Sequence, residues 1–292
     1  MRQTRTGVYD LWRPDGTPVP AVFDSPHSGT DYPDDFGHSV PMARLRRAED
    51  MHVDDLFSAA PDRGATFLAA RFPRSYVDPN RAADDIDPKL IDGIWPDPVS
   101  VSDKSRLGHG LIWRLCPPDV AIYDRKLEVA EVRRRIDRFH QPYHAALADE
   151  LGRLYGRFGR VFHVNCHSMP AASAPLVIDR AGARRRADFV LDDRDGTSCS
   201  PTFRILVQET LQDMGYAVAI NDPYKGVELV RAHADPAAGR HSLQIEISRA
   251  LYMDEDSFAR SANYDRLKSD IDRLVAILCE HAAGRREAEA AE

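Results

Sequence analysis

The sequence predicts an α/β protein with a mixed, mostly parallel central sheet and helices on both faces, in three layers. Two observations favour this class. Short apolar segments with the period-two pattern of strands alternate with longer segments whose apolar residues recur every three to five positions. The chain also shows no internal repeat and no clean linker, so we expect one domain over residues 1–292. Its length, with 43% hydrophobic residues, allows a sizeable core.

Two strands are expected in the first third of the chain, and each is followed by a polar group of interest. Residues 21–23 form a short apolar run that breaks at Ser25-Pro26, so His27 falls on the loop behind it. Residues 65–69 form a second strand candidate, and the run after it ends in Asn80-Arg81. The planar guanidinium of an arginine matches a carboxylate in bidentate fashion, although a surface loop also explains this pair.

A helix is expected between these strands, over residues 48–60, because apolar residues form one stripe along it and Pro61 closes it. Asp50 and Asp54 are four residues apart and would share one face of this helix. Acidic residues in a first turn also suit the helix dipole, so a structural role for both stays open.

Three further helices follow from apolar spacing and end signals. The longest covers residues 124–158, and Pro142 should kink it or divide it into two helices. The next covers residues 200–214, with a serine cap at its start and a glycine after its end. The last helix carries apolar residues from 264 to 278.

Polar, Pro-rich or Gly-rich segments are expected to be loops. The longest is an excursion near residues 82–110, which could cover an active site, since loops of this length are usually functional or mobile. The arginine run at 184–186 and residues 192–198 are expected to be solvated loop and turn. The charged tail from residue 284 should fray.

The run within residues 161–170 is the strongest strand candidate, because apolar and polar residues alternate strictly along it. The run ends in His167 and Ser168, before the turn-forming Pro170. Ligands of open α/β sheets bind beyond the carboxyl ends of strands, so His167 should reach the edge where chemistry occurs. A lone histidine at such a place is also often a core or capping residue.

The remaining strands are expected at residues 176–178, 217–220 and 243–247. In the last of these, apolar residues share one face and Glu246 points from the other. A buried carboxylate needs a partner or a function. Glu246 could act as a general base, or it could form a structural salt bridge with Arg249 or another residue.

Composition limits the possible partners. A net charge of −7 gives a nucleic-acid partner no global electrostatic support. No apolar run approaches the roughly 20 residues that span a bilayer, and the N-terminal residues lack an apolar signal core. The four cysteines are widely spaced and form no CxxC pair, which argues against a zinc ribbon or disulfide framework and fits a reducing cytoplasm.

Two histidines and one carboxylate are a sufficient ligand set for a catalytic zinc ion that keeps one position for water. His27, His167 and Asp50 could supply this set, with Glu246 as the base that takes a proton from the water and passes it to a leaving nitrogen. Because the ligands are far apart in the sequence, their spacing carries no signature of its own.

Several motifs, in this order along nearly the whole chain, resemble the N-formylglutamate amidohydrolase (N-formylglutamate deformylase) family. They are Ser25-Pro-His-Ser-Gly29, Asp50-Met-His-Val-Asp54, Asp78-Pro-Asn-Arg81, Cys166-His-Ser-Met-Pro170, Asn221-Asp-Pro-Tyr-Lys-Gly226, Gln244-Ile-Glu-Ile-Ser-Arg249 and Leu251-Tyr-Met253. The resemblance implies a fold similar to that of the zinc carboxypeptidases. It also implies zinc-dependent hydrolysis of N-formyl-L-glutamate to formate and L-glutamate in histidine degradation, with one Zn²⁺ per chain.

Carried over motif by motif, the resemblance implies roles for individual residues. His27 and His167 correspond to zinc ligands, Glu246 to the catalytic carboxylate, and Arg81 with Asn80 to a group that binds a carboxylate of a small anionic substrate. Asp50 fits best as the acidic ligand, with Glu49 and Asp54 as rivals. This chain has Asn165 where the family commonly has an aspartate two residues before the second histidine, which puts the tuning of the site in doubt.

Other functions stay open from the sequence. A carboxypeptidase, or an amidohydrolase for other N-acyl amino acids, could use the same fold. A non-haem iron oxygenase also uses two histidines and one carboxylate, although the additional Glu246 argues against it. A metal-binding or ligand-sensing module without catalysis is the non-enzymatic alternative.

Overall fold

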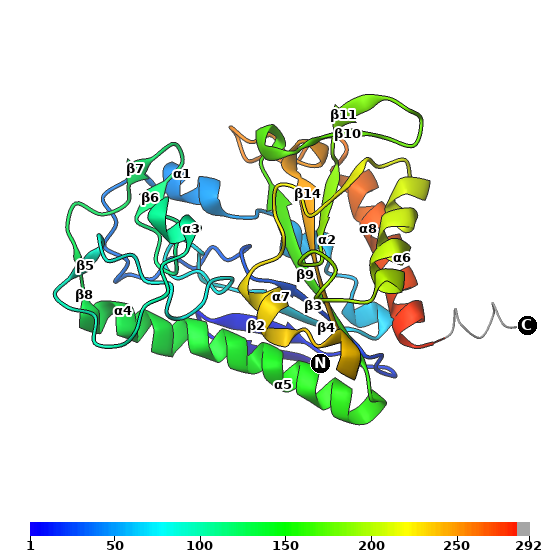
Figure 1. Cartoon of the computed structure of the whole chain (residues 1–292), viewed down its shortest axis with the longest axis horizontal. Helices are drawn as coiled ribbons and strands as arrows, with labels where there is room; N and C mark the ends of the chain where they lie inside the picture. The colour runs from blue at the N-terminus through cyan, green and yellow to red at the C-terminus, as the bar shows by residue number, and fades with distance from the viewer. Residues whose placement is uncertain (285–292) are drawn as a thin grey trace, which may run out of the picture.

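The computed structural model describes residues 1–284, and the predicted α/β class is confirmed (Figure 1). An eight-stranded mixed sheet forms the centre. In spatial order its strands are β1 (Arg2–Arg5), β2 (Tyr9–Trp12), β4 (Thr66–Ala70), β3 (Ala21–Ser25), β9 (Val161–Met169), β14 (Arg240–Ser248), β12 (Phe189–Asp192) and β13 (Val218–Ile220). The four central strands β4, β3, β9 and β14 are parallel, so their carboxyl ends meet at one edge.

Helices cover both faces of this sheet, which gives the expected three layers (Figure 1). The apolar face packs against α2 (Val53–Leu56), α6 (Pro201–Asp213) and α8 (Tyr264–Ala282). The other face lies under α5 (Gln141–Phe158) and α7 (Glu228–His233). This second face carries polar side chains of β9 and β14, which are the residues that alternate with the apolar core positions.

Most predicted strands and helices are present within a few residues of their expected bounds. The 200–214 helix is α6, where the Ser200 hydroxyl accepts a hydrogen bond from the Phe203 N–H and Gly215 adopts a positive φ. The long 124–158 segment is α4 (Val129–Arg135), a π-turn (Ile136–His140) and α5, with Pro142 in the first turn of α5. The segment is therefore divided near Pro142, as expected, and the π-turn is the element that separates α4 from α5.

The helix predicted at 48–60 is wrong in its first half. Only α2, over Val53–Leu56, is α-helical, and His52 before it has a φ of 66°. Asp50 is outside the helix because its N–H donates to the carbonyl of His27 at 2.9 Å, which holds it in a loop. Asp50 and Asp54 therefore do not share a helix face.

Other differences concern short elements. The 176–178 strand is β10 (Leu176–Ile178), but it pairs with β11 (Arg184–Arg186) in a hairpin outside the central sheet, so the loop expected at 184–186 is a strand. The strands β1, β2 and β12 and the helix α7 were not predicted. The tail expected to fray from 284 lies, beyond Gly284, outside the described residues.

Residues 82–110, where the excursion was expected, are mostly irregular. This segment contains β5 (Ile91–Asp92), which pairs with β8 (Leu127–Glu128), and the short helix α3 (Asp103–Arg106). The remaining short elements are α1 (Met42–Leu45), β6 (Leu115–Cys116), β7 (Val120–Ala121) and 3₁₀ turns at Arg46–Ala48, Pro61–Arg63, Ala171–Ser173, Pro236–Ala238 and Arg249–Leu251. None of the described helices combines the length and the apolar character that crossing a membrane requires.

Candidate active site

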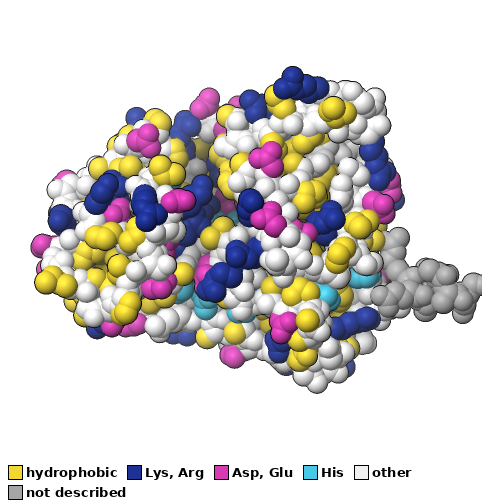
Figure 2. All heavy atoms as spheres, viewed as in Figure 1, with side chains coloured by type: hydrophobic (Ala, Val, Ile, Leu, Met, Phe, Trp, Pro, Cys, Tyr) yellow, Lys and Arg dark blue, Asp and Glu magenta, His cyan; other side chains and the backbone are white. Residues whose placement is uncertain are grey.

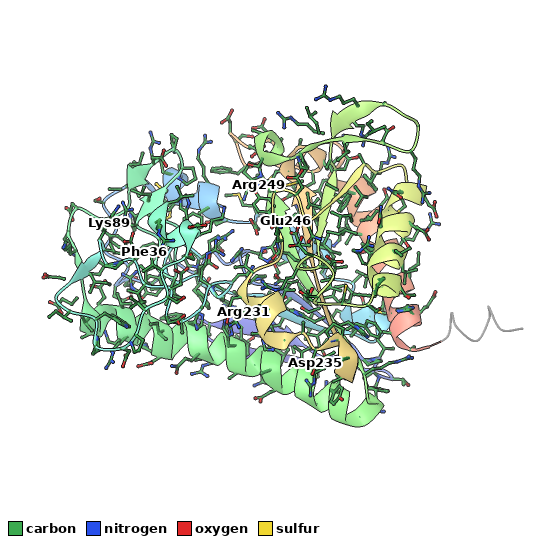
Figure 3. The ribbon with its side chains drawn as sticks, viewed as in Figure 1. Phe36, Lys89, Arg231, Asp235, Glu246 and Arg249 are labelled. Carbon is green, nitrogen blue, oxygen red and sulfur yellow. The ribbon has the colours of Figure 1, made fainter. Side chains whose placement is uncertain are left out.

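The candidate site lies at the carboxyl edge of the four parallel strands. His27 is on the loop after β3, as expected. His167 was expected at the end of its strand, and it lies inside β9, two residues before the strand ends. Glu246 of β14 is its register partner on the neighbouring strand, and Figure 3 shows Glu246 and Arg249 near the same end of β14.

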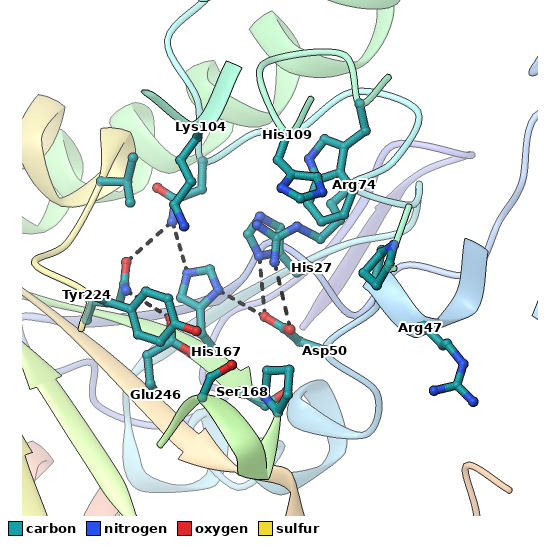
Figure 4. A pocket seen from close by; sticks show the side chains of 18 of the residues that line it. His27, Arg47, Asp50, Arg74, Lys104, His109, His167, Ser168, Tyr224 and Glu246 are labelled. Atoms are coloured by element: carbon teal, nitrogen blue, oxygen red, sulfur yellow. Dashed lines mark hydrogen bonds and ion pairs between the residues drawn. The ribbon is translucent and has the colours of Figure 1, made fainter. Parts of the chain in front are cut away.

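Three predicted residues converge at this edge (Figure 4). The Nδ1 atom of His167 is 3.0 Å from Oδ2 of Asp50, and Nδ1 of His27 is 3.3 Å from the same oxygen. All three side chains are buried, and their ligand atoms lie within 4.8 Å of one another. The structure thus brings together residues that are up to 140 positions apart in the sequence.

The outer nitrogen of each imidazole is fixed by a hydrogen-bond acceptor. The Nε2–H of His27 donates to Oδ1 of Asp78 at 2.7 Å, and the Nε2–H of His167 donates to Oδ1 of Asn165 at 2.7 Å. Each Nδ1 therefore directs a lone pair toward Asp50. Burial and the neighbouring His27 lower the pKa of His167 to about 4, so this ring is neutral near pH 7.

Two imidazole nitrogens and a carboxylate oxygen thus face one another, at 3.3 and 3.0 Å from the carboxylate. This donor set fits a divalent cation of the zinc type, and acceptors such as Asp78 behind the histidines are the usual means of orienting such ligands. Burial raises the pKa of the Asp50 carboxyl, but the adjacent His167 and His27 rings and the charge of Arg74 outweigh it and hold the pKa well below its usual range.

The rival acidic residues lie elsewhere. Glu49 accepts hydrogen bonds from the Tyr32 hydroxyl at 2.6 Å and from Nε of Arg46 at 3.3 Å, so its carboxylate is turned away from the histidines. Asp54 lies in the first turn of α2 and is not part of the cluster. Among the three candidates, geometry favours Asp50.

Asn165 does not leave His167 without electrostatic support. Its Nδ2 donates to Oδ1 of Asp24 at 2.7 Å while its Oδ1 accepts from His167. Burial raises the pKa of the Asp24 carboxyl, but hydrogen bonds from His163, Asn165 and Tyr143 keep it below its usual value. Asp24 thus supplies the carboxylate that is missing at position 165. The Asn165 amide connects it to the His167 imidazole, because an amide can both donate and accept a hydrogen bond.

Glu246 is buried beside this cluster. Its Oε1 accepts a hydrogen bond from Nε2 of Gln244 at 3.0 Å, and the same amide nitrogen donates to Oδ2 of Asp192 at 2.9 Å. Burial, together with the negative charges of Asp50 and Asp192, raises the pKa of Glu246 well above its usual value. A carboxyl group with a raised pKa in a pocket is suited to accept and return a proton.

The pocket in front of these residues has a volume of about 240 Å³ and is strongly cationic. Five basic side chains line it: Arg47, Arg74, Arg81, Lys104 and Arg249. Figure 2 shows Lys and Arg side chains gathered in the central hollow of this face. Within residues 1–284, Arg81 and Lys104 have no carboxylate within 4.0 Å, whereas the other three form ion pairs.

Arg81 and Asn80 both reach the pocket, but protein contacts already hold them. Arg81 donates from Nη1 to the carbonyl of Asn80 at 2.9 Å and from Nε to the carbonyl of His109 at 3.1 Å. The Asn80 side chain has Nδ2 at 3.2 Å from Nε2 of His167, and its Oδ1 accepts from the N–H of Leu229 at 3.0 Å. Asn80 is thus in contact with His167 as well as with the pocket.

Sequence reasoning assigned no role to several residues of the site. Asp78 holds His27, and it is itself held by the Nη2 of Arg74 at 3.0 Å and the Nε1–H of Trp113 at 3.2 Å. The i, i+4 spacing of Arg74 and Asp78 after a strand was a usable signal. Lys104 comes from the excursion and had no signal, because only the folded chain brings it to the pocket.

Comparisons with known proteins identify the family of the chain. Residues 19–253 match the family model described as N-formylglutamate amidohydrolase. The chain is 30% identical to the N-formylglutamate deformylase of Pseudomonas aeruginosa over 243 residues, covering 82% of this chain and 84% of that one. The enzyme of the same name from Pseudomonas putida is 28% identical over 241 residues, covering 81% and 83%. The crystal structure of N-formylglutamate amidohydrolase from Ralstonia eutropha superposes with a TM-score of 0.90 at 49% identity, covering 96% of this chain and 99% of that one.

Proposed function

Because the chain belongs to the N-formylglutamate amidohydrolase family, we propose that it hydrolyses the amide bond of N-formyl-L-glutamate to formate and L-glutamate. One observation carries this proposal beyond the family: a buried carboxylate, Glu246, lies beside a His–Asp–His cluster in a pocket with two unpaired cations. This arrangement combines a proton acceptor, a cation site and a place for an anionic substrate.

His27, Asp50 and His167 would hold the metal ion, and we propose zinc, one ion per chain. When bound, such an ion would polarise the formyl carbonyl and lower the pKa of a water molecule. Asp78 and Asn165 orient the two imidazoles with Nδ1 inward, which is the geometry that can bind a cation.

Glu246 would carry the proton. The reaction adds water across the C–N bond, so the hydroxyl ends on the formyl carbon and the remaining proton on the glutamate nitrogen. Gln244 holds Oε1 of Glu246, and we place the transferred proton on Oε2. In this role the carboxylate first accepts a proton from water and then donates it to the leaving nitrogen.

Arg81 and Lys104 would bind the carboxylates of the substrate. N-formylglutamate carries two negative charges, and these two cations are the pocket side chains without a carboxylate partner in the described chain. Burial and the charges of Arg81 and Arg74 lower the pKa of Lys104, which an incoming carboxylate would reverse. Asn80, which touches His167, would contribute a further donor beside Arg81.

The proposed setting is histidine degradation in the cytoplasm, with a small anionic molecule as substrate and with neither nucleic acid nor membrane as partner. The four buried, unpaired cysteines suit a reducing compartment. The net charge of −7 is unfavourable for binding nucleic acid.

The test is release of the free amino acid by purified protein from N-formyl and N-acetyl derivatives of glutamate, glutamine and leucine, with and without a chelator. We expect N-formylglutamate to be the best substrate and the chelator to abolish turnover. The variant Glu246→Gln should lose about 10²–10⁴-fold in kcat while it retains its metal, because the amide cannot accept the proton. Preference for another acyl amino acid would show that the proposed substrate is wrong. An unchanged kcat in Glu246→Gln would show that Glu246 has only a structural role.

A further inference from the structure

The loop that carries Arg81 is held in an unusual way. Three consecutive backbone carbonyls, those of Pro79, Asn80 and Arg81, each accept a hydrogen bond from a side chain. The Nη1 of Arg81 donates to the middle one at 2.9 Å. The outer two accept from histidines of the long helix: Nε2 of His144 donates to Pro79 at 2.7 Å, and Nε2 of His140 donates to Arg81 at 2.8 Å.

The two histidines are four residues apart and form a stacked pair, with ring centroids 4.2 Å apart and planes inclined by 26°. His140 is the last residue of the π-turn, and π-turns within helices often mark functional positions. Burial lowers the pKa of both rings, that of His140 to about 4, so two positive charges do not oppose each other in the stack. In the described chain Nδ1 of His140 has no partner, so its single N–H is the one given to the loop.

This loop contacts both histidines of the candidate site and lines its pocket. Asp78 before it holds His27, Asn80 within it touches His167, and Arg81 at its end lines the pocket. The loop has no regular secondary structure and is buried, so its carbonyls depend on these side chains for hydrogen bonds. Because Arg81 donates to its own neighbour's carbonyl, a shift of the peptide would shift the guanidinium with it.

We propose that His140 and His144 are positioning residues for substrate binding: from beneath the loop they fix the Pro79–Arg81 peptide, and through it the Arg81 guanidinium. This rests on the proposed function, in which Arg81 binds a substrate carboxylate. Neither histidine lines the pocket, so both act through Arg81.

The first test replaces each ring by one that packs alike but donates nothing. We expect His144→Phe and His140→Phe to raise KM for N-formylglutamate about tenfold, with kcat within about threefold of wild type and metal content unchanged. The variant His144→Gln retains a side-chain N–H and should recover most of the lost affinity. His233→Phe is the matched control, because His233 is a half-buried histidine of α7 whose ring centroid lies 6.4 Å from that of His144, and its Nε2 has no hydrogen-bond partner within the described residues.

A double-mutant cycle separates positioning from general stability. If His144 acts through Arg81, the variant Arg81→Lys/His144→Phe should be no worse in KM than Arg81→Lys alone. Additive losses, or equal effects of His144→Phe and His233→Phe, would overturn the proposal. So would a loss confined to kcat or to metal content.

A second readout is independent of catalysis. In His144→Phe, hydrogen exchange of the backbone amides around residues 78–82 should become faster, whereas in His233→Phe it should not. If wild-type protein releases no formate, the proposed function fails but this measurement still decides whether the histidines hold the loop. Unchanged exchange in both variants would show that they do not.

Discussion

At the scale of single residues, Asp192 is a carboxyl group in a position that is unfavourable for its charged form. It is fully buried at the end of β12, and burial raises its pKa to about 7. Its Oδ2 accepts a hydrogen bond from Gln244, but its Oδ1 has no hydrogen-bond partner within residues 1–284. One accepted hydrogen bond does not offset the loss of hydration of a charged group.

This gives a prediction for stability. Between an unfolded-state pKa of 3.8 and a folded-state pKa of about 7, the folded protein retains a proton that the unfolded chain has released, so stability falls as the pH rises through this window. Asp192→Asn does not titrate, and its stability relative to wild type should therefore rise from pH 4 to pH 7, by at most about 4 kcal/mol. Urea denaturation at several pH values measures this, with the exposed Asp103→Asn as control. A constant difference between variant and wild type would contradict it.

Residues differ in how far the sequence could predict their place. His27, His167 and Glu246 were found because each stands near the end of a strand whose apolar pattern is clear. Asp78 and Lys104 were not, because their importance comes from contacts with segments far away in the sequence. Asn165 looked like a loss of charge, and only its hydrogen bond to Asp24 shows how the chain compensates for it.

At the scale of elements, the loop before α2 decides which acidic residue meets the histidines. The backbone N–H of Asp50 donates to the carbonyl of His27, and the Ser28 hydroxyl donates to the carbonyl of Asp50. These bonds fasten the Asp50 loop to the loop that follows β3. Asp54, one turn later, belongs to α2 and lies outside the cluster.

We therefore expect Asp50→Ala to lower metal affinity much more than Asp54→Ala does. Metal titration against a competing chelator measures both, and circular dichroism checks that each variant is folded. Asp50→Asn is a useful companion, because it keeps the shape of the side chain while removing its charge. A greater loss of metal in Asp54→Ala would mean that the acidic ligand comes from the helix and not from the loop.

The helix predicted at 48–60 shows why element boundaries are hard to predict. Its apolar stripe is real, since Val53, Leu56 and Phe57 are all buried, but the stripe does not show where the helix begins. A left-handed residue at position 52 and tertiary hydrogen bonds set the start. The strand β1 escaped prediction for another reason: all four of its residues are exposed, so it has no apolar pattern.

At the scale of the whole molecule, the charge of the pocket lining is opposite in sign to the net charge of the chain. The chain has a net charge of −7, yet the pocket is lined by five basic side chains. A dianionic substrate would therefore be attracted locally, by Arg81 and Lys104, and not by the overall field. The sequence predicted this requirement and named Arg81, while Lys104 reaches the pocket only because the excursion folds over it.

The last prediction tests this local attraction at Arg81. A guanidinium offers parallel N–H donors to a carboxylate, whereas a lysine ammonium cannot reproduce that geometry. A hydrogen bond to a charged group contributes about 1.5–3 kcal/mol, so Arg81→Lys should lower kcat/KM for N-formylglutamate about tenfold or more, with zinc content unchanged. The exposed Arg133→Lys, which disturbs surface contacts with Asp97 and the Trp95 ring far from the site, is the matched control.

Substrates with one carboxylate amidated identify what Arg81 binds. If Arg81 binds the side-chain carboxylate, the defect of Arg81→Lys should shrink for N-formylglutamine and persist for the α-amide of N-formylglutamate. If it binds the α-carboxylate, the two substrates exchange roles. Equal losses on all three substrates would mean that Arg81 only maintains the loop through the carbonyls of Asn80 and His109, and the positive charge that selects the substrate would then have to come from Lys104.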